Sequence, residues 1–249
     1  MMQPFEVLVD VLVSDRDPAR WGALFAPGAR FVDHTSIAPE SDAVGWLGAT
    51  HERAPCTTFS CEWHMTDGNA GAAWVWFHLP DPDEADIRYD APHLLVGSVG
   101  RAGSLSSIEL FGPFGTWDET VEDWEGAVAD LEMAPDPSLR ARAPAHPPLP
   151  APAPDRAILE AVADALVTEN WLDLVAWGAR WHDHAGYPIE RWADGRRSER
   201  TRVLGGARAV VALDHELPAV IVVHVDETGR LTYLDHLCDW SAEAAAQEV

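Results

Sequence analysis

One seven-residue pattern occurs twice in the chain, and this recurrence limits the possible folds more than any other feature. Residues 28–34 read GARFVDH, and residues 178–184 read GARWHDH. Each copy follows an apolar segment of helical character that contains a tryptophan. An internal repeat of this kind indicates that one structural unit is present twice. We therefore expect two copies of one α+β domain.

A stretch rich in proline and alanine separates the two copies. Residues 134–154 have this composition, which favours a stiff and extended linker. We place the first domain at residues 1–133 and the second domain at residues 155–249. The chain has 249 residues, of which 47% are hydrophobic, and this is enough for two domains that each bury a core.

Hydrophobic periodicity predicts a shared order of elements in the two halves: two helices, a short strand and a run of antiparallel strands. The helix expected at residues 42–51 has no counterpart in the second half, so we expect the first domain to be the fuller copy. The expected helices cover residues 4–13, 18–25, 42–51, 116–133, 156–168 and 171–177. The expected strands cover residues 29–33, 59–64, 73–77, 93–99, 105–111, 179–183, 207–213, 219–225 and 231–237.

Later parts of the halves can also be aligned. Residues 70–74 resemble residues 207–211, and residues 103–109 resemble residues 229–235. This alignment predicts that strands of the second sheet repeat strands of the first.

The chain carries a formal charge of −24, from 41 acidic and 17 basic residues. A field of this sign repels nucleic acids and anionic membranes, so we expect neither as a partner. No segment is apolar for long enough to span a bilayer, and no charged-then-apolar leader opens the chain. The expected location is therefore the cytoplasm.

The three cysteines, Cys56, Cys61 and Cys238, indicate free thiols in a reducing compartment. None of them belongs to a C-x-x-C pair, which argues against a zinc site. His182 and His184 lie two residues apart, but this spacing alone is a weak indication of a metal. We therefore expect no metal and no cofactor.

Two segments resemble the nuclear transport factor 2-like superfamily. They are LFAPGARFVDH at residues 24–34, after two helices, and the closing strand SSIELFG at residues 106–112. The superfamily includes SnoaL-like polyketide cyclases, ketosteroid isomerase, scytalone dehydratase and limonene epoxide hydrolase. The resemblance covers most of residues 4–132 and, more weakly, residues 156–240.

This resemblance implies a cone-shaped domain, in which a curved antiparallel sheet packs on helices around an apolar pocket. Members of the superfamily often dimerise through their sheets. Two tandem cones would form such a dimer within one chain, as an intramolecular pseudo-dimer, and a further homodimer of the whole chain is left open.

The resemblance also implies site residues. The aspartate at the end of the first strand is often the general base, which indicates Asp33 and its copy Asp183. The closing strand of ketosteroid isomerase lines the pocket at the position of Glu109, and likewise of Asp235. The tyrosine of that isomerase is missing, because residues 7–11 read VLVDV, and so is its second acid, because residues 95–97 read LVG. These differences argue against a steroid isomerase with that oxyanion hole.

The chemistry of such a site follows from burial. A carboxylate that loses hydration in an apolar cone holds its proton more strongly, and a second carboxylate nearby would separate the pair into an acid and a base. The alternative is that Asp33 caps the turn where the strand ends. Adjacent strand residues point to opposite faces, so His34 is not expected to share the pocket of Asp33.

A histidine and several aromatic residues complete the candidate site. Strict alternation places His64 on one face of its strand with Glu62 and Ser60, and on the pocket side it would act with Asp33 as acid and base. Trp74 and Trp76 share a face that is either a ligand wall or the seam between the halves. The candidate substrate-binding residues are Trp63, Trp74, Trp76, Phe31, Phe111 and Tyr233.

Two functions of different classes fit these residues, and a third, a metal-dependent enzyme, would require bound metal in the purified protein. The first is a cofactor-free cyclase, dehydratase or isomerase that acts on a small, hydrophobic, polyketide-like substrate. The second is a non-catalytic module that binds a small molecule or a protein, in which case Asp33 is held in a turn.

Overall fold

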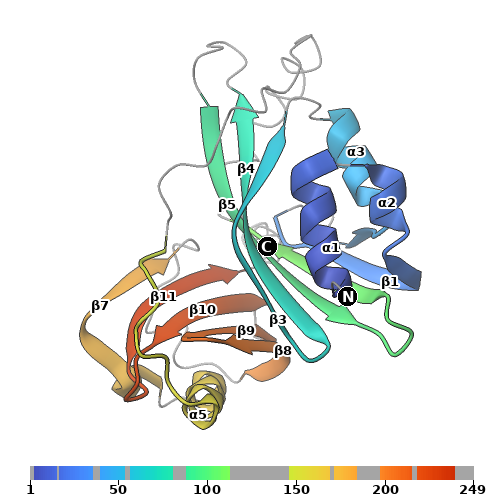
Figure 1. Cartoon of the computed structure of the whole chain (residues 1–249). Coiled ribbons are helices and arrows are strands. Elements are labelled where there is room, and N and C mark those ends of the chain that lie inside the picture. Colours follow the sequence, from blue (N-terminus) through green and yellow to red (C-terminus); the bar gives the residue numbers. More distant parts are fainter. Residues whose placement is uncertain are drawn as a thin grey trace, which may run out of the picture.

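The computed structural model describes residues 3–15, 17–35, 40–53, 57–80, 88–112, 146–168, 171–183, 197–214 and 218–238. Their strands form two sheets, one from each half of the chain, and the fold is α+β. Figure 1 shows the two sheets beside each other, with the helices of the first half on the side of the first sheet that faces away from the second. The expected helix at residues 116–133, the part of the expected linker at residues 134–145 and the tail after Trp240 lie outside the described residues.

The first half forms a six-stranded sheet in the order β2-β1-β6-β5-β4-β3. Its elements are α1 (Pro4–Asp10), the π-helix η1 (Val11–Asp15), α2 (Pro18–Gly22), β1 (Phe25–Asp33), β2 (Glu40–Asp42), α3 (Trp46–Arg53), β3 (Thr58–Asp67), β4 (Ala70–Pro80), β5 (Arg88–Val99) and β6 (Leu105–Phe111). The pair β1 and β6 is parallel, and all other neighbours are antiparallel.

The second half forms a five-stranded sheet in the order β7-β11-β10-β9-β8. Its elements are α5 (Arg156–Val167), the 3-10 helix η2 (Trp171–Leu174), β7 (Val175–Asp183), β8 (Ser198–Gly205), β9 (Arg208–Asp214), β10 (Ala219–Val225) and β11 (Leu231–Cys238). The pair β7 and β11 is again parallel. The strand order therefore matches that of the first sheet, with β2 as an addition to the first.

The repeated pattern occupies the same place in both sheets. Gly28 and Gly178 have φ angles of 76° and 78°, in the left-handed region that glycine tolerates best. Each lies on the strand where the register to the neighbouring parallel strand shifts. Val32 then pairs with Glu109, and His182 pairs with Asp235. The repeated glycine thus allows each first strand to bend before it pairs with the closing strand.

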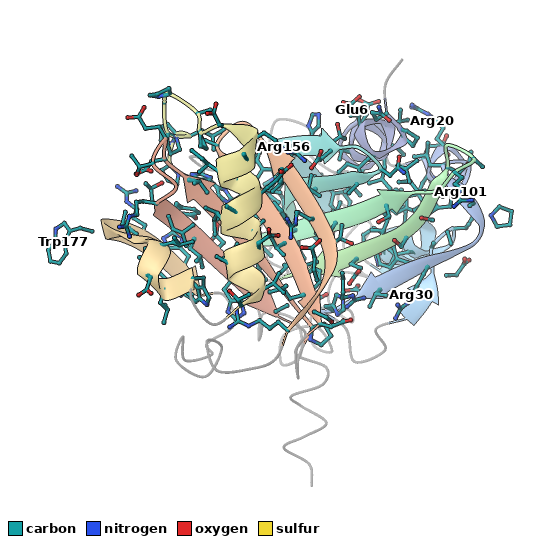
Figure 2. All side chains as sticks on the ribbon, turned by 90° about the horizontal axis from the view of Figure 1, so that it is seen from below. Glu6, Arg20, Arg30, Arg101, Arg156 and Trp177 are labelled. Atoms are coloured by element: carbon teal, nitrogen blue, oxygen red, sulfur yellow. The ribbon has the colours of Figure 1, made fainter. Side chains whose placement is uncertain are left out.

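Each sheet has one face covered by helices and one face turned to the other sheet, which we call the inner face. On the helix face of the first sheet, apolar residues from α1, α2 and α3 pack on the strands, and they include Phe5, Trp21 and Trp46. On the second sheet, α5 buries side chains at the helical spacing of Leu159, Val162, Ala163 and Leu166. Figure 2 shows α5 lying across its sheet.

The inner faces share a third apolar cluster, which joins the two halves. Its buried members are Ala72, Trp74, Leu94, Val96, Phe111, Val203, Val210, Ala212, Val220, Val222 and Leu237. Polar contacts between the halves support it at the margins, among them Arg200, which lies 2.9 Å from Glu109, and Arg156, which donates to Asp67 at 2.8 Å.

Two expected elements differ from the structure, and one strand was not expected. Residues 42–51 are not one helix, because Asp42 ends β2 and accepts hydrogen bonds from the backbone of Val44 and Gly45 before α3 begins. Residues 171–177 form only a short 3-10 turn before β7. The strand β8 was not expected, because its residues SERTRVLG carry too many charges to be recognised as a strand.

Candidate functional site

Asp33 lies at the end of β1, on the helix face, and its carboxylate holds the following turn. Oδ1 accepts hydrogen bonds from the backbone N–H and the hydroxyl of Thr35, at 3.0 Å and 2.6 Å. Oδ2 lies 3.4 Å from the indole nitrogen of Trp46, which stacks on Phe31. Asp33 therefore caps the turn at the end of β1, which is the structural role expected for it if it is not a catalytic base.

His34 points to the inner face, as strand alternation predicts. Its Nε2 lies 3.0 Å from Glu109 Oε2, and its ring stacks on Phe111 at 4.2 Å between centroids. Glu109 also pairs with Arg200 of the second half. The expectation that Glu109 shares the cone of Asp33 is therefore wrong, because Asp33 pairs in register with Leu110, one residue further along β6.

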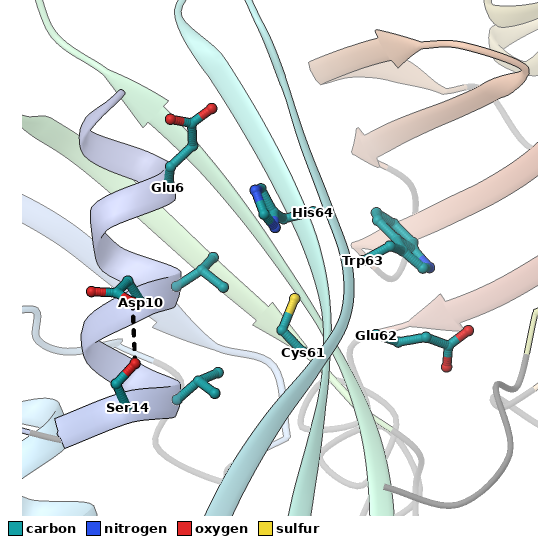
Figure 3. A pocket seen from close by; sticks show the side chains of 9 residues that line it. Glu6, Asp10, Ser14, Cys61, Glu62, Trp63 and His64 are labelled. Atoms are coloured by element: carbon teal, nitrogen blue, oxygen red, sulfur yellow. Dashed lines mark hydrogen bonds between the residues drawn. The ribbon is translucent and has the colours of Figure 1, made fainter. Parts of the chain in front are cut away.

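A β-bulge in β3 decides where His64 points. The register between β3 and β4 shifts between Cys61 and Trp63, so strict alternation fails there. Figure 3 shows Cys61 and His64 on the side of α1, and Glu62 and Trp63 on the other side of the strand. The expected pairing of His64 with Glu62 on one face is wrong for this reason.

His64 lines a groove of about 540 Å³ between α1 and the edge strand β3. Val9, Val13 and Cys61 make the apolar part of the lining, and Glu6 lies across the groove from His64 (Figure 3). Burial, with a smaller contribution from neighbouring Glu62, raises the pKa of Cys61 to about 12. The thiol is therefore protonated near neutral pH and is a poor nucleophile.

The inner faces contain a buried ionic cluster around His146. Its Nδ1 lies 2.8 Å from Glu62 Oε1, and its Nε2 lies 2.8 Å from Asp235 Oδ2. The side chains of His146, Glu62 and Asp235 are 2%, 10% and 0% exposed, so water does not screen these pairs. Asp235, like Glu109, points to the inner face, and its expected place in the second cone is wrong.

Two further basic side chains complete this cluster. Arg208 donates from Nε to His224 Nε2 at 3.2 Å, and its guanidinium lies 3.9 Å from the ring centre of Trp63. Burial lowers the pKa of His224 to about 3, and the positive charges of Arg208 and His146 lower it further. His224 is therefore neutral near pH 7, which leaves its Nε2 lone pair to accept from Arg208.

The pKa of His146 shifts in the opposite direction to that of His224. Burial disfavours its charged form, but hydrogen bonds and charge attraction from Asp235 and Glu62 outweigh burial and raise its pKa. As an imidazolium it offers one N–H to each carboxylate. The pair of carboxylates is thus balanced by His146 and Arg208.

Most of the expected substrate-binding residues surround this cluster or lie beside it. The rings of Trp74 and Tyr233 lie 4.4 Å and 5.3 Å from that of His146, and the indole of Trp76 donates to Glu62. Phe111 belongs to the inner apolar cluster, whereas Phe31 lies in the helix-face core. Trp74 and Trp76 therefore lie on the seam between the halves, one of the two positions expected for them.

Asp183 ends β7 and pairs in register with His236, but its side chain lies outside what the structure describes. His146 was not among the expected site residues, because it is a single histidine in a Pro/Ala-rich stretch. A polar aromatic residue in an otherwise apolar linker was the only sequence signal that could have identified it.

No group of three or more His, Cys, Asp or Glu side chains among the described residues is arranged to hold a metal ion. None of the helices in the described ranges is both long and apolar enough to cross a membrane.

No protein-family model and no curated protein matches the sequence. Several solved structures resemble about half of the chain. An NTF2-like protein from Burkholderia thailandensis has a TM-score of 0.39 at 16% identity, over 51% of this chain and 98% of its own. A protein of ketosteroid isomerase-like fold from Catenulispora acidiphila, solved with trimethylamine, has a TM-score of 0.37 at 15% identity, over 44% and 84%. IdmH from Streptomyces antibioticus, described as a proposed polyketide cyclase, has a TM-score of 0.38 at 17% identity, over 51% and 100%. Similarity at these values says nothing about activity.

Proposed function

We propose that the chain is a cofactor-free acid/base enzyme that acts on a small hydrophobic substrate in the groove between α1 and β3. The observation that carries this proposal is the position of His64. Its side chain is exposed, faces the groove, and forms no hydrogen bond with another described residue. An imidazole with a free ring nitrogen can remove or deliver a proton near neutral pH.

The groove suits a small substrate in size and lining. Its volume of about 540 Å³ lies within the usual range for ligand sites, and valine side chains contribute an apolar wall. Glu6 supplies a carboxylate on the opposite wall, held in place because its Oε2 accepts from the backbone N–H of Gln3 at 2.9 Å. His64 would transfer the proton, and Glu6 would stabilise the positive charge that His64 gains.

The roles of the other expected residues follow from this proposal. Asp33 supports the turn after β1, and Glu109 and Asp235 join the two halves. The halves, residues 1–133 and 155–249 with the linker between them, would then form a pseudo-dimer through their inner faces. Cyclisation, dehydration and isomerisation of a polyketide-like compound all need such a proton transfer.

The elimination reaction of nitrobenzisoxazole tests the proposal without knowledge of the natural substrate. A base removes one C–H proton, the N–O bond breaks, and the coloured phenolate forms. We expect the purified chain to accelerate this reaction, and His64→Gln to reduce the rate at least about tenfold, because general-base contributions commonly reach a hundredfold or more.

Two matched variants show which side chain acts. Glu6→Gln keeps an acceptor for the Gln3 backbone and should lower the rate less than His64→Gln. Asp33→Asn should leave the rate unchanged. The proposal fails if the wild-type rate equals the buffer rate, or if Asp33→Asn abolishes a rate that His64→Gln preserves.

A non-catalytic binding module is the second candidate, and the hydrogen bonds that hold Asp33 in its turn favour it. Under this reading an apolar probe such as anilinonaphthalene sulfonate would bind the groove and His64→Gln would not change its affinity, while no elimination would be observed.

A further inference from the structure

Three polar side chains lie in a row across β3, β4 and β5. Ser60 Oγ is 2.7 Å from His78 Nε2, and His78 Nδ1 is 2.7 Å from Asp90 Oδ1. The register supports this row, because His78 pairs directly with Asp90 on β5 and with Thr58 on β3, two residues before Ser60. Three adjacent strands therefore fix the order serine, histidine, carboxylate.

The hydrogen bonds determine where the protons lie. A carboxylate only accepts, so the Asp90 contact requires the proton of neutral His78 to be on Nδ1. Nε2 then carries a lone pair and must accept, so the Ser60 hydroxyl donates to it. This is the tautomer in which a histidine can take the proton of a serine that attacks a carbonyl carbon.

The serine of the row is less buried than the histidine and the aspartate, as a nucleophilic site requires. The side chains of His78 and Asp90 are 1% and 2% exposed, whereas Ser60 is half-buried. The base and its orienting carboxylate are thus kept from water, and Ser60 is the less buried end of the row. The hydroxyl of Thr58, on the same face, is buried and has no hydrogen-bond partner among the described residues.

This row is separate from the groove of His64. Ser60 lies on β3 before the bulge, opposite Trp76, whose indole donates to Glu62 on the inner face. His64 and Cys61 face α1 on the other side of the same strand (Figure 3). Figure 1 shows that the end of β4 and the start of β5, where His78 and Asp90 lie, point away from the second sheet.

We propose that Ser60, His78 and Asp90 form a second reactive site, which transfers an acyl group from a small neutral ester. Ser60 Oγ bonds to the acyl carbon while its proton passes to His78 Nε2. The ester C–O bond then breaks, and the alcohol leaves with that proton. Water then gives a proton to His78 Nε2 and attacks the acyl carbon, the bond from that carbon to Ser60 Oγ breaks, and Ser60 Oγ takes the proton back from His78 as the carboxylic acid leaves. The charge of −24 and the nearby Asp90 and Glu62 disfavour an anionic ester.

A fluorophosphonate probe tests this proposal on the intact chain. Ser60 Oγ would displace fluoride from phosphorus, its proton and the fluoride would leave as HF, and the mass of the protein would increase by that of one probe minus HF. We expect peptide mapping to locate the label on Ser60 and not on Ser106, a strand serine whose hydroxyl donates to the backbone oxygen of Ser98. We also expect hydrolysis of p-nitrophenyl acetate above the buffer rate, abolished by Ser60→Ala and unaffected by Ser106→Ala.

Asp90→Asn distinguishes a reactive triad from a hydrogen-bond network that only supports the sheet. The amide NH2 can donate to Nδ1, which moves the imidazole proton to Nε2, so that Nε2 no longer accepts from Ser60. Labelling should slow at least about 100-fold, as for other triads that lose the carboxylate. No label on wild-type Ser60, or equal labelling rates for the wild type and a folded Asp90→Asn variant, would overturn the proposal. Because the groove is on the other face, His64→Gln should label at the wild-type rate.

Discussion

Replacing His146 by leucine tests the account of the inner faces most directly. The substitution keeps an apolar side chain of moderate size in contact with Trp74 but removes both ion pairs. Glu62 and Asp235 then remain with side chains 10% and 0% exposed, beside the positive charge of Arg208 but without that of His146. If the same pairs were on the surface, their loss would cost at most about 1 kcal/mol. Because they are buried, we expect the free energy of unfolding to fall by about 3–5 kcal/mol.

Urea unfolding followed by tryptophan fluorescence measures this loss, because Trp63 and Trp74 both contact His146. His182→Gln is the matched control. This second histidine lies 3.7 Å from Asp235 but is 48% exposed, so its replacement should change stability by less than about 1 kcal/mol. A third variant removes one buried negative charge. Adding Asp235→Asn to His146→Leu should recover part of the lost free energy of unfolding.

The pH dependence gives an independent check with a defined sign. The folded pKa of His146 is raised above its unfolded value, so its contribution is complete below the unfolded pKa of about 6.5 and disappears as pH rises through the folded pKa. The stability difference between wild type and His146→Leu should therefore shrink with increasing pH. A loss below about 1 kcal/mol, a difference that grows with pH, or further destabilisation by Asp235→Asn in the His146→Leu background would refute the reasoning.

Two further predictions concern the first half. Gly97→Ala should lower the free energy of unfolding by about 1–3 kcal/mol in urea titrations, because its Cβ would lie 2.6 Å from Ile108 Cδ1 and 2.9 Å from the Phe5 ring. Gly100→Ala is the control, since the nearest atom to its Cβ is 3.5 Å away, and equal losses in both would contradict the packing argument. Asp33→Ala should lower the free energy of unfolding by about 1 kcal/mol, because it removes the acceptor for Thr35. Thermal unfolding of this variant and of Asp33→Asn would show whether the amide oxygen restores the turn.

Local patterns in the sequence predicted several strands. They also predicted that Asp33 and His34 point to opposite faces, but they did not predict the face of His64. The turn at Gly68 placed the hairpin of β3 and β4, and alternation along β1 separated Asp33 from His34. The alignment of residues 103–109 with residues 229–235 is also correct in register, because Glu109 and Asp235 face equivalent partners on β1 and β7. These features depend on residues close together in the chain.

The expected alignment of residues 70–74 with residues 207–211 is wrong by one residue. The sequence alignment matches Ala70 with Ala207, but the backbone oxygens that accept from Val99 and Val225 belong to Asn69 and Ala207. Residue 74 therefore corresponds to residue 212, and both belong to the inner cluster. A slip of one position exchanges the two faces of a strand, so the alignment predicted the wrong face for each side chain of β9.

The sequence by itself determined the repeated unit, its glycine bend and most of its strands, because periodicity and turn residues act over short distances. Only the tertiary structure decided which face each acid occupies. The bulge in β3 turned His64 to the groove, and the packing of two sheets turned Glu109 and Asp235 inward. The same packing enclosed His146 between two carboxylates that are far from it in the chain. Such pairings depend on long-range contacts, and no local pattern of residues encodes them.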